Sequence, residues 1–439
     1  MIAEFISSHS VSISAGLLLL AYVFIALEKI PKMTIALLGG AITIVLGLVS
    51  QSKTLDGLIN PNYFINFIDF NVIFLLVAMM IIVAITTKSG VFNWLANELL
   101  KFTKGHPVKI LFALGIFTAF VSAFLDNVTT VILIMPITFA IAKKLEIDPV
   151  PYLLTEVFAS NIGGTATLIG DPPNIIIGSA GGLTFMDFLK ELTPVVVIIL
   201  LIVVSVLALV FKNKLHADQD KMNAVAQIDN SGTITNKNLM LRSTIVLALV
   251  ILGFMLHDMI HLETCVVAML GASFLLIFEK PNDILKDVEW NTIFFFIGLF
   301  IIIGGLEASG GIKLMAQWIL DVTKGSQTAT SMIILWASGI ISGVIDNIPY
   351  TATMAPMLVE IEKTMGEAYT FPLWWALSLG ACLGGNMTII GAAANVIVSE
   401  NAYKEGHPIS FMRFLKYGVI VVAISLIVST VYIYLRYLK

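Results

Sequence analysis

The stretch SAFLDNVTTVILIMP (122–136) sets an aspartate and an asparagine inside one of the most apolar regions of the chain. A second stretch, SGVIDNIPYTATMAP (342–356), contains the same pair, with the aspartate 220 positions further on, at 346 instead of 126. A charged side chain inside a membrane costs a few kcal/mol or more, so it is retained for a function or a specific contact. The repetition of the pair therefore bears on both the fold and the function.

Apolar residues dominate the composition. The chain has 439 residues, of which 58% are apolar and 12% are charged, whereas a soluble domain carries about 25% charged residues. A helix needs roughly 20 predominantly apolar residues to cross the hydrocarbon core of a bilayer. We therefore expect an all-α polytopic membrane protein, and no cluster of basic and aromatic residues indicates a nucleic-acid partner. Apolar runs of spanning length recur at 11–27, 33–49, 193–211, 240–256, 264–278 and 415–435.

The sequence contains an internal duplication. Residues 69–136 align with 289–356 without a gap, so that DFNVIF meets EWNTIF and one Asp-Asn pair meets the other. With the offset longer by one residue, GGTATLIGDPPNII (163–176) aligns with GGNMTIIGAAANVI (384–397). The predicted units are a first repeat at 1–211, a linker at 212–238 and a second repeat at 239–439.

Each repeat is predicted to contain three spanning helices, a hairpin with the Asp-Asn pair at its tip, a helix broken by a Gly-rich run, and a final spanning helix. Lysines flank both ends of the first hairpin, which favours a re-entrant loop that enters and leaves on one face. Two full spans joined by a charged turn on the far side are the alternative. The predicted hairpins lie at about 107–142 and 328–360, and the broken helices at about 152–180 and 372–400.

Re-entrant hairpins leave five crossings in each repeat, ten in all, and this odd number inverts the second repeat relative to the first. Both termini then lie on one face of the membrane. By the positive-inside rule the linker and the Lys/Arg-rich loops are cytoplasmic, and the termini are outside. The tryptophan pair 374–375 is predicted to anchor a helix at the membrane interface. The cytoplasmic loops, with 18 of the 25 lysines and arginines, are 28–32, 88–109, 143–148, 212–242, 279–289 and 400–416.

Acidic residues within a membrane line ion or substrate paths by default. Asp126 and Asp346 could instead serve only as helix caps that accept backbone N–H bonds at a hairpin tip. The two roles are compatible, because a hairpin tip exposes backbone groups that need partners. Their repetition at equivalent positions favours a shared site near the axis that relates the two repeats.

The Gly-rich breaks supply further polar groups. Unwound backbone exposes carbonyls that hold a cation, whereas the N-terminus of a half-helix attracts an anion. Asp171 of the first break aligns with Ala392 in the second, so the halves differ in charge. The motifs contain no lysine or arginine, and oxygen ligands with a net negative charge suit Na⁺ or H⁺ better than a bare anion. The candidate ion or substrate ligands are Asp126, Asn127, Thr129, Thr130, Asn161, Gly164, Thr165, Thr167, Asp171, Asn174, Asp346, Asn347, Thr351, Gly385, Asn386, Thr388 and Asn395, of which Asp126, Asn127, Asp346 and Asn347 are candidate Na⁺ ligands.

Four long motifs, SAFLDNVTT, NIGGTATLIGDPPNIII, SGVIDNIPYTATMAP and ACLGGNMTIIGAAANVIV, closely resemble those of the arsenite-pump/NhaD (ArsB/NhaD) group of the ion transporter superfamily. Within this group the sequence is most similar to the melanosomal P protein and its prokaryotic relatives. The resemblance covers most of the chain and is weakest at the first helix and at the linker. A prokaryotic inner (plasma) membrane protein is the expectation that follows.

The resemblance implies a homodimer with scaffold and transport domains, two re-entrant hairpins, two broken helices and elevator-type alternating access. In the family, each cation site lies between a hairpin tip and the adjacent helix break. Carried onto this chain, the first site joins 126–127 to the break at 163–171, and the second joins 346–347 to the break at 384–388. The carboxylate-binding branch of the superfamily has Ser-Asn-Thr motifs at its hairpins. This chain has DNVTT and DNIPYT there, which argues against a dicarboxylate substrate.

The leading hypothesis is secondary active Na⁺/H⁺ antiport, with Asp126, Asp346 and Asp171 as ligands shared by the two cations. The alternatives are H⁺- or Na⁺-coupled efflux of arsenite or another small anion, and a passive anion channel. No enzymatic activity is expected, because the sequence shows no nucleophile–base pair or nucleotide-binding motif. No cofactor is expected beyond the coupling ions Na⁺ and H⁺, and a separate ATPase subunit would be a partner only of an arsenite pump.

Overall fold

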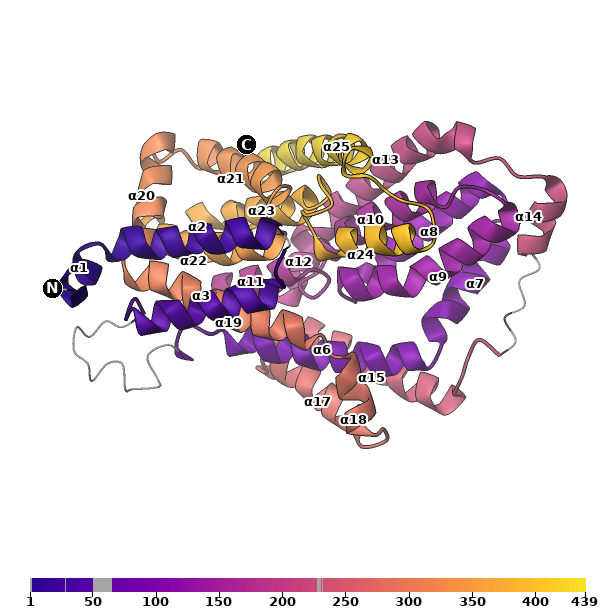
Figure 1. The fold of residues 1–439 in the computed structure, drawn as a ribbon, viewed down its shortest axis with the longest axis horizontal. Coiled ribbons are helices and arrows are strands. Elements are labelled where there is room, and N and C mark those ends of the chain that lie inside the picture. The colour runs from indigo at the N-terminus through magenta and orange to yellow at the C-terminus, as the bar shows by residue number, and fades with distance from the viewer. Residues whose placement is uncertain (1, 28, 50–64, 227–229, 231) are drawn as a thin grey trace.

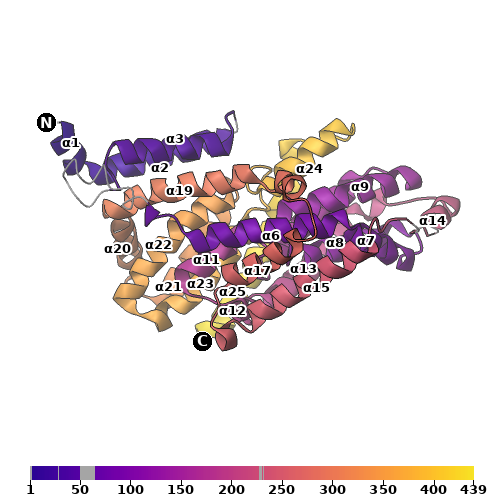
Figure 2. The same cartoon turned by 90° about the horizontal axis from the view of Figure 1, so that it is seen from below.

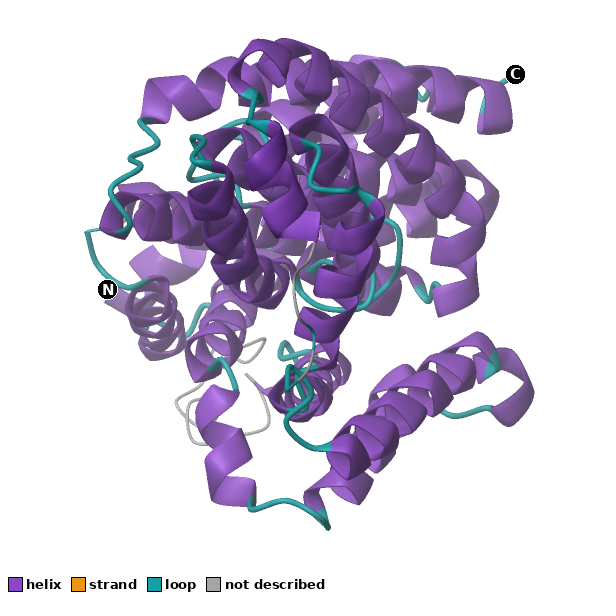
Figure 3. Ribbon diagram, turned by 90° about the vertical axis from the view of Figure 1, so that its right-hand side faces the viewer, coloured by secondary structure: helices purple, strands orange, loops and turns teal. Residues whose placement is uncertain are grey.

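The fold is all-helical. The structure is a computed structural model that describes residues 2–27, 29–49, 65–226, 230 and 232–439, and these residues contain no β-strand (Figure 3). Among them, seven helices are long and apolar enough to span a membrane, and an eighth span arises if Thr264–Leu276 and Pro281–Asp287, which meet at a bend of 118°, are counted together. The expectation of an all-α polytopic membrane protein is confirmed.

The helices follow the chain in the order shown in Figure 1. The first part contains α1 (Ile2–Ser8), α2 (Ser10–Leu27), α3 (Lys32–Val45), α6 (Phe70–Lys88), α7 (Val91–Phe102), α8 (Pro107–Ser122), α9 (Asn127–Leu145), α10 (Val150–Gly164), α11 (Pro172–Gly181), α12 (Phe185–Glu191) and α13 (Thr193–Phe211). The linker contains α14 (Gln219–Ala226). The second part contains α15 (Lys237–Met255), α16 (His257–Ile260), α17 (Thr264–Leu276), α18 (Pro281–Ile284), α19 (Trp290–Ala308), α20 (Gly311–Thr323), α21 (Gln327–Ser342), α22 (Asn347–Met365), α23 (Glu367–Gly384), α24 (Ala393–Lys404) and α25 (Phe411–Tyr437).

Segments that align in sequence adopt the same local structure in the two halves. Gly90 before α7 and Gly310 before α20 both have left-handed φ angles, 81° and 85°, which glycine adopts without a steric penalty. Each half then has a helical hairpin, α8–α9 or α21–α22, whose tip lies near the middle of the molecule in Figure 1. Each hairpin precedes an interrupted helix, α10–α11 or α23–α24. The inversion of the second repeat, the re-entrant path of the hairpins and the ten crossings stay predictions.

Packing divides the helices into two groups. The framework group comprises α2, α3, α6, α15, α17 and α19, which pack mainly on one another, with α3 running along α19 (Figure 2). The hairpin group comprises the two hairpins, the two interrupted helices, α13 and α25; in it α8 packs on α10 and α21 packs on α23. Helices α7 and α20 connect the groups, because each follows a framework helix and precedes a hairpin.

The tryptophan pair 374–375 is covered by neighbouring helices and so cannot anchor a helix through contact with lipid headgroups, which makes this prediction wrong. Trp374 is 2% exposed and Trp375 is 0% exposed within the hairpin group. The indole N–H of Trp374 donates to a carboxylate oxygen of Glu362 at 3.3 Å. Trp375 packs edge-on against Phe188 and Phe371. Tryptophan is common at membrane interfaces, so residue type alone predicts such a position. Here neighbouring helices cover both side chains instead.

The close approach of α8 and α10 depends on a glycine. A Cβ on Gly163 would lie 2.1 Å from the carbonyl oxygen of Ala119, a distance that only backbone movement would relieve. Gly384 occupies the equivalent crossing of α21 and α23, where a Cβ would lie 2.4 Å from the carbonyl oxygen of Gly339. Small residues at such crossings let helix backbones approach closely in membrane proteins.

We predict that Gly163→Ala destabilises the protein by about 1–3 kcal/mol, since overpacking a closed contact forces the two helices apart. Unfolding of the purified protein in detergent, followed by its melting temperature, measures this loss. Gly16→Ala in α2 is the matched control, because nothing lies within 4 Å of its added Cβ. Equal melting temperatures for the two variants would contradict the close packing of α8 on α10.

Candidate ion-binding site

Each hairpin tip carries an aspartate that caps the second helix of the hairpin. Asp126 accepts the backbone N–H of Thr129 at 2.9 Å through Oδ1, and Asp346 accepts that of Ile348 at 3.1 Å through Oδ1. A side-chain oxygen at this position satisfies an otherwise unpaired N–H of the first helical turn. Capping therefore uses one carboxylate oxygen at each tip. Capping and ion binding remain compatible, because a carboxylate has two oxygens.

The interrupted helices are held together by asparagines on their own second halves. In the first, Asn174 Nδ2 donates to the carbonyls of Thr165 (3.1 Å) and Thr167 (2.8 Å). In the second, Asn395 Nδ2 donates to the carbonyls of Gly385 and Thr388, both at 2.8 Å. A carbonyl oxygen has two lone pairs, so each can still coordinate a cation.

Threonines in the helix breaks form hydrogen bonds with the hairpin tips. The hydroxyl of Thr167 donates to the carbonyl of Ala123, and that of Thr388 donates to the carbonyl of Gly343 at 2.6 Å. Thr165 makes a local contact instead, because its hydroxyl donates to the carbonyl four residues earlier at 2.8 Å. The two halves thus build hairpin tip and helix break as one unit.

Asparagine amides occupy the space between hairpin and break in the first half. With its amide oriented to satisfy its neighbours, Asn127 donates to the carbonyls of Ser160 (3.2 Å) and Gly170 (3.3 Å). Gly164 makes room for this side chain, since a Cβ there would lie 2.5 Å from a terminal atom of the Asn127 amide. Asn127 is 7% exposed, so its polar atoms depend on these contacts.

The two interrupted helices meet through buried amides. Asn161 Nδ2 donates to Oδ1 of Asn386 at 2.9 Å and to Oδ1 of Asn395 at 3.0 Å. The hydroxyl of Ser378 donates to Oδ1 of Asn174 at 2.6 Å. These contacts join residues of the first repeat to residues of the second. The predicted ligands Asn161, Asn174, Asn386 and Asn395 therefore form one central polar layer.

Three polar groups among the predicted ligands have no hydrogen-bond partner among the described residues. They are the Nδ2 of Asn386 and the hydroxyls of Thr130 and Thr351. All three residues are fully buried. A buried polar group without a partner is costly, which makes these atoms candidates for contact with a transported species.

Asp171 lies against the second hairpin. Its two carboxylate oxygens accept hydrogen bonds from Asn347 Nδ2 at 3.4 and 3.3 Å, and its side chain is buried. The backbone N–H of Asn347 also donates to the carbonyl of Gly391 in the second break. The resemblance implies that Asp171 belongs to the first site, beside the first hairpin tip. In the structure the carboxyl group of Asp171 interacts with Asn127 of the first tip as well as with Asn347 of the second.

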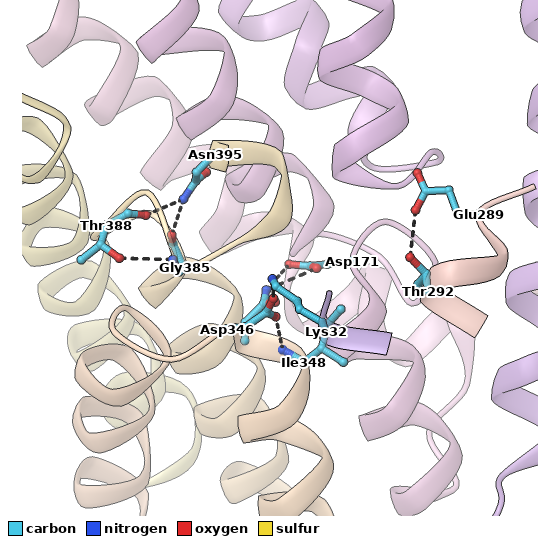
Figure 4. A network of polar contacts seen from close by, with 11 residues as sticks. Lys32, Asp171, Glu289, Thr292, Asp346, Ile348, Gly385, Thr388 and Asn395 are labelled. Carbon is cyan, nitrogen blue, oxygen red and sulfur yellow. Dashed lines mark hydrogen bonds and ion pairs between the residues drawn. The ribbon is translucent and has the colours of Figure 1, made fainter. Parts of the chain in front are cut away.

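Lys32 forms an ion pair with Asp346 (Figure 4). The lysine is the first residue of α3 in the framework group, and its side chain is 25% exposed, whereas that of Asp346 is 2% exposed. No sequence signal predicts this contact, because Lys32 lies in the predicted cytoplasmic loop 28–32 and the motifs themselves contain no cation. A residue outside every motif thus neutralises the second hairpin aspartate.

Asp126 has a different electrostatic environment. No described lysine or arginine forms an ion pair with it. The carboxyl group of Glu289 lies close enough for the two charges to interact, and its Oε2 accepts the hydroxyl of Thr292 at 3.0 Å (Figure 4). Glu289 begins the motif EWNTIF that aligns with DFNVIF. The duplication could therefore have singled it out as a candidate.

Glu156 is a second acidic residue that the sequence reasoning missed. It lies on α10 and is 2% exposed; its Oε1 accepts the hydroxyl of Thr138, and its Oε2 has no partner among the described residues. An unpaired carboxylate in such surroundings is strongly disfavoured, whereas a protonated carboxyl is tolerated. The only available signal was a lone glutamate in an apolar helix, and the aligned position in the second repeat, 377, is a leucine.

The sequence profile of the citrate transporter family (CitMHS) matches residues 22–380 of this chain. The chain belongs to the citrate transporter family. Members of the family are membrane transporters, so this chain is a membrane transporter of the ion transporter superfamily, as the motifs indicated.

Several curated proteins share the full length of the chain. "Uncharacterized transporter Rv2684" of Mycobacterium tuberculosis is 42% identical over 95% of this chain and 96% of its own length. "Uncharacterized transporter slr0753" of Synechocystis is 28% identical over 99% of this chain and 98% of its own. The "P protein" of Sus scrofa is 31% identical over 96% of this chain but only 59% of its own length. The resemblance to the P protein and its prokaryotic relatives is confirmed.

A solved structure shows the same fold. The YdaH transporter of Alcanivorax borkumensis superimposes with a TM-score of 0.56 over 97% of each chain, at 14% sequence identity. At this identity the comparison concerns the fold and not the substrate.

We predict that Lys32→Met destabilises the protein by about 3–5 kcal/mol, because it leaves a buried aspartate without its counter-charge. The double variant Lys32→Met/Asp346→Asn removes both charges and should recover most of that loss. Unfolding in detergent of both single variants and the double variant gives the coupling energy. Strictly additive losses would show that the ion pair contributes nothing.

We predict that Glu156→Gln changes the stability by less than about 1 kcal/mol, since glutamine keeps the shape and still accepts the Thr138 hydroxyl. Glu156→Ala, the matched truncation, should cost about 2–5 kcal/mol through the cavity that it leaves. The same unfolding measurement compares the two variants. A glutamine variant as unstable as the alanine variant would mean that Glu156 is ionised and paired.

Proposed function

We propose that the protein is a secondary active transporter that exchanges Na⁺ for H⁺, with Asp126 as the main ligand of the coupling cation. One observation carries this proposal: the carboxyl groups of Asp126 and Glu289 interact electrostatically and have no ion-paired lysine or arginine among the described residues, whereas Asp346 is paired with Lys32. A cation is therefore electrostatically favoured at the first hairpin tip. We call this tip, with Asp126, Glu289 and the adjacent break, the first site.

Two neighbouring carboxylates are suited to exchange. Like charges at short range disfavour double ionisation, so the pair takes up either a proton or a metal cation. The carbonyls of Thr165 and Thr167 and the amide of Asn127 add neutral oxygens in the adjacent break, which are the ligands that Na⁺ shares with other hard cations. Occupation of the pair by H⁺ excludes Na⁺, and this exclusion couples the two fluxes.

Alternating access by an elevator-type movement fits the division of the helices. The site residues belong to the hairpin group, with the exception of Lys32 and Glu289, which belong to or border the framework group. Movement of the hairpin group past the framework would carry the site from one side of the membrane to the other. In this proposal a homodimer holds the framework fixed in the bilayer.

A coupled anion transporter is the second candidate. Asn386 presents a buried Nδ2 without a partner among the described residues, and the half-helices α11 and α24 begin near the same layer. Both features attract an anion. Arsenite or another small anion would fit, with the acidic groups serving the coupling ion only. The family description names citrate, but the hairpins have Asp-Asn where the carboxylate-binding branch has Ser-Asn-Thr.

We predict that proteoliposomes with an internal pH dye and an imposed proton gradient respond to added NaCl but not to choline chloride. Asp126→Asn should abolish this response, because the amide cannot exchange a proton for Na⁺. Glu289→Gln should weaken it roughly tenfold or more, since about 1.4 kcal/mol of lost attraction is a factor of ten in affinity. Asp321→Asn, at an exposed position on α20, is the matched control and should transport normally.

Other outcomes assign other functions. A response to arsenite or citrate that requires a pH or Na⁺ gradient, without a response to NaCl alone, would replace exchange by coupled anion transport. Anion current that needs no second ion would indicate a channel. Transport by Asp126→Asn at the wild-type rate would remove Asp126 from the path.

A further inference from the structure

The second hairpin tip has the same elements as the first but a different charge. Asp346 and Asp171 supply two carboxyl groups there, and Lys32 supplies one ammonium group. We call this arrangement, with Asn347 and the adjacent break, the second site. The lysine comes from α3 and not from the hairpin or the break.

We propose that the Lys32 ammonium group is a tethered competitor of the transported cation at the second site. In the described conformation it occupies the position of a cation on Asp346, so that the second site binds no Na⁺. This inference rests on the proposed function, since it assumes that the transported ion is a cation.

The framework fixes the ammonium in place. Lys32 begins α3, which packs along α19 so closely that a Cβ on Gly40 would lie 3.1 Å from the carbonyl oxygen of Gly298. The lysine backbone therefore cannot follow the hairpin if the hairpin group moves. The contact joins a fixed charge to a movable one.

A second contact from the framework reaches the same helix. The hydroxyl of Tyr22 on α2 donates to the carbonyl of Pro349 at 2.5 Å and also contacts the hydroxyl of Thr353. Tyr22 on α2 and Lys32 on α3 thus both contact the first turns of α22 or its capping residue. Movement of the hairpin group would break both contacts together, and it would leave Asp346 free to accept a cation.

The competition follows from electrostatics. Two positive charges in contact with one buried carboxylate repel each other strongly, because the surroundings screen them poorly. The ammonium group has the advantage of being covalently attached, so its effective concentration at Asp346 far exceeds that of Na⁺ in solution. Removal of the lysine charge would leave two carboxylates without a cation, as at the first site.

Direct binding of radioactive Na⁺ to the purified full-length protein tests this inference. We expect wild type to bind about one Na⁺ per chain and Lys32→Gln to bind about two, because the vacated carboxylate becomes a second independent site. Lys32→Gln/Asp346→Asn should return to about one, since it lacks the second carboxylate. Lys313→Gln, an exposed lysine on α20, is the matched control and should bind as wild type does.

A second variant keeps the test decisive if Lys32→Gln does not fold. Asp346→Asn alone should bind as many Na⁺ as wild type, because the second site holds none in either protein. Loss of a bound Na⁺ in Asp346→Asn would overturn the inference, as would an unchanged count in folded Lys32→Gln. The melting temperature of each variant shows whether it is folded.

The same experiment separates this inference from the proposed function. Suppose that wild type binds no Na⁺, that Lys32→Gln binds one, and that Lys32→Gln/Asp346→Asn binds none. The inference about Lys32 is then supported, and Na⁺ coupling at Asp126 is contradicted. If wild type binds one Na⁺ that Asp126→Asn abolishes, and Lys32→Gln binds no more, the proposed function stands and the role of Lys32 is wrong.

Discussion

The cost of charge in an apolar interior governs the centre of this transporter. Carboxylates and amides that lie among membrane helices must find partners within the protein, because no water in the bilayer core can supply them. The hairpin aspartates meet part of this need by capping α9 and α22. The asparagines of the interrupted helices meet another part by binding the carbonyls that the breaks expose. Hairpin tip and helix break therefore form one unit in each half.

Duplication supplies this unit twice, and residues outside it make the two copies different. Lys32 brings a positive charge to the second copy, and Glu289 brings a further carboxyl group to the first. Asp171, although it belongs to the first break, contacts Asn347 at the second tip. A symmetric pair of sites would give the two tips equal affinity for a cation. The added charges make the two tips electrostatically different, which is the basis of the proposal that one tip binds the ion and the other does not.

Much of the fold could be predicted because its signals are local. The apolar runs, the alignment of DFNVIF with EWNTIF and the glycine-rich breaks each act through the residues around them. Asp126 and Asp346 were identified because an acidic residue in an apolar run is conspicuous wherever it occurs. The burial of the tryptophan pair 374–375 was predicted wrongly, because side-chain type does not reveal which helices cover a position. Glu156 and Glu289 were missed because neither lies in the Asp-Asn or Gly-rich motifs.

The sequence by itself determined the membrane class, the internal duplication, the family, and the pairing of an acidic hairpin tip with a broken helix in each half. These features follow from hydrophobicity, helix-breaking residues and motif spacing. Each of these signals can be recognised within a short segment of sequence. Only the tertiary structure decided which charged and polar groups interact: Lys32 with Asp346, Asp171 with Asn347, and Glu289 with Asp126. The reason is physical, since these partners are more than 150 positions apart in sequence. Only helix packing brings such distant residues into contact.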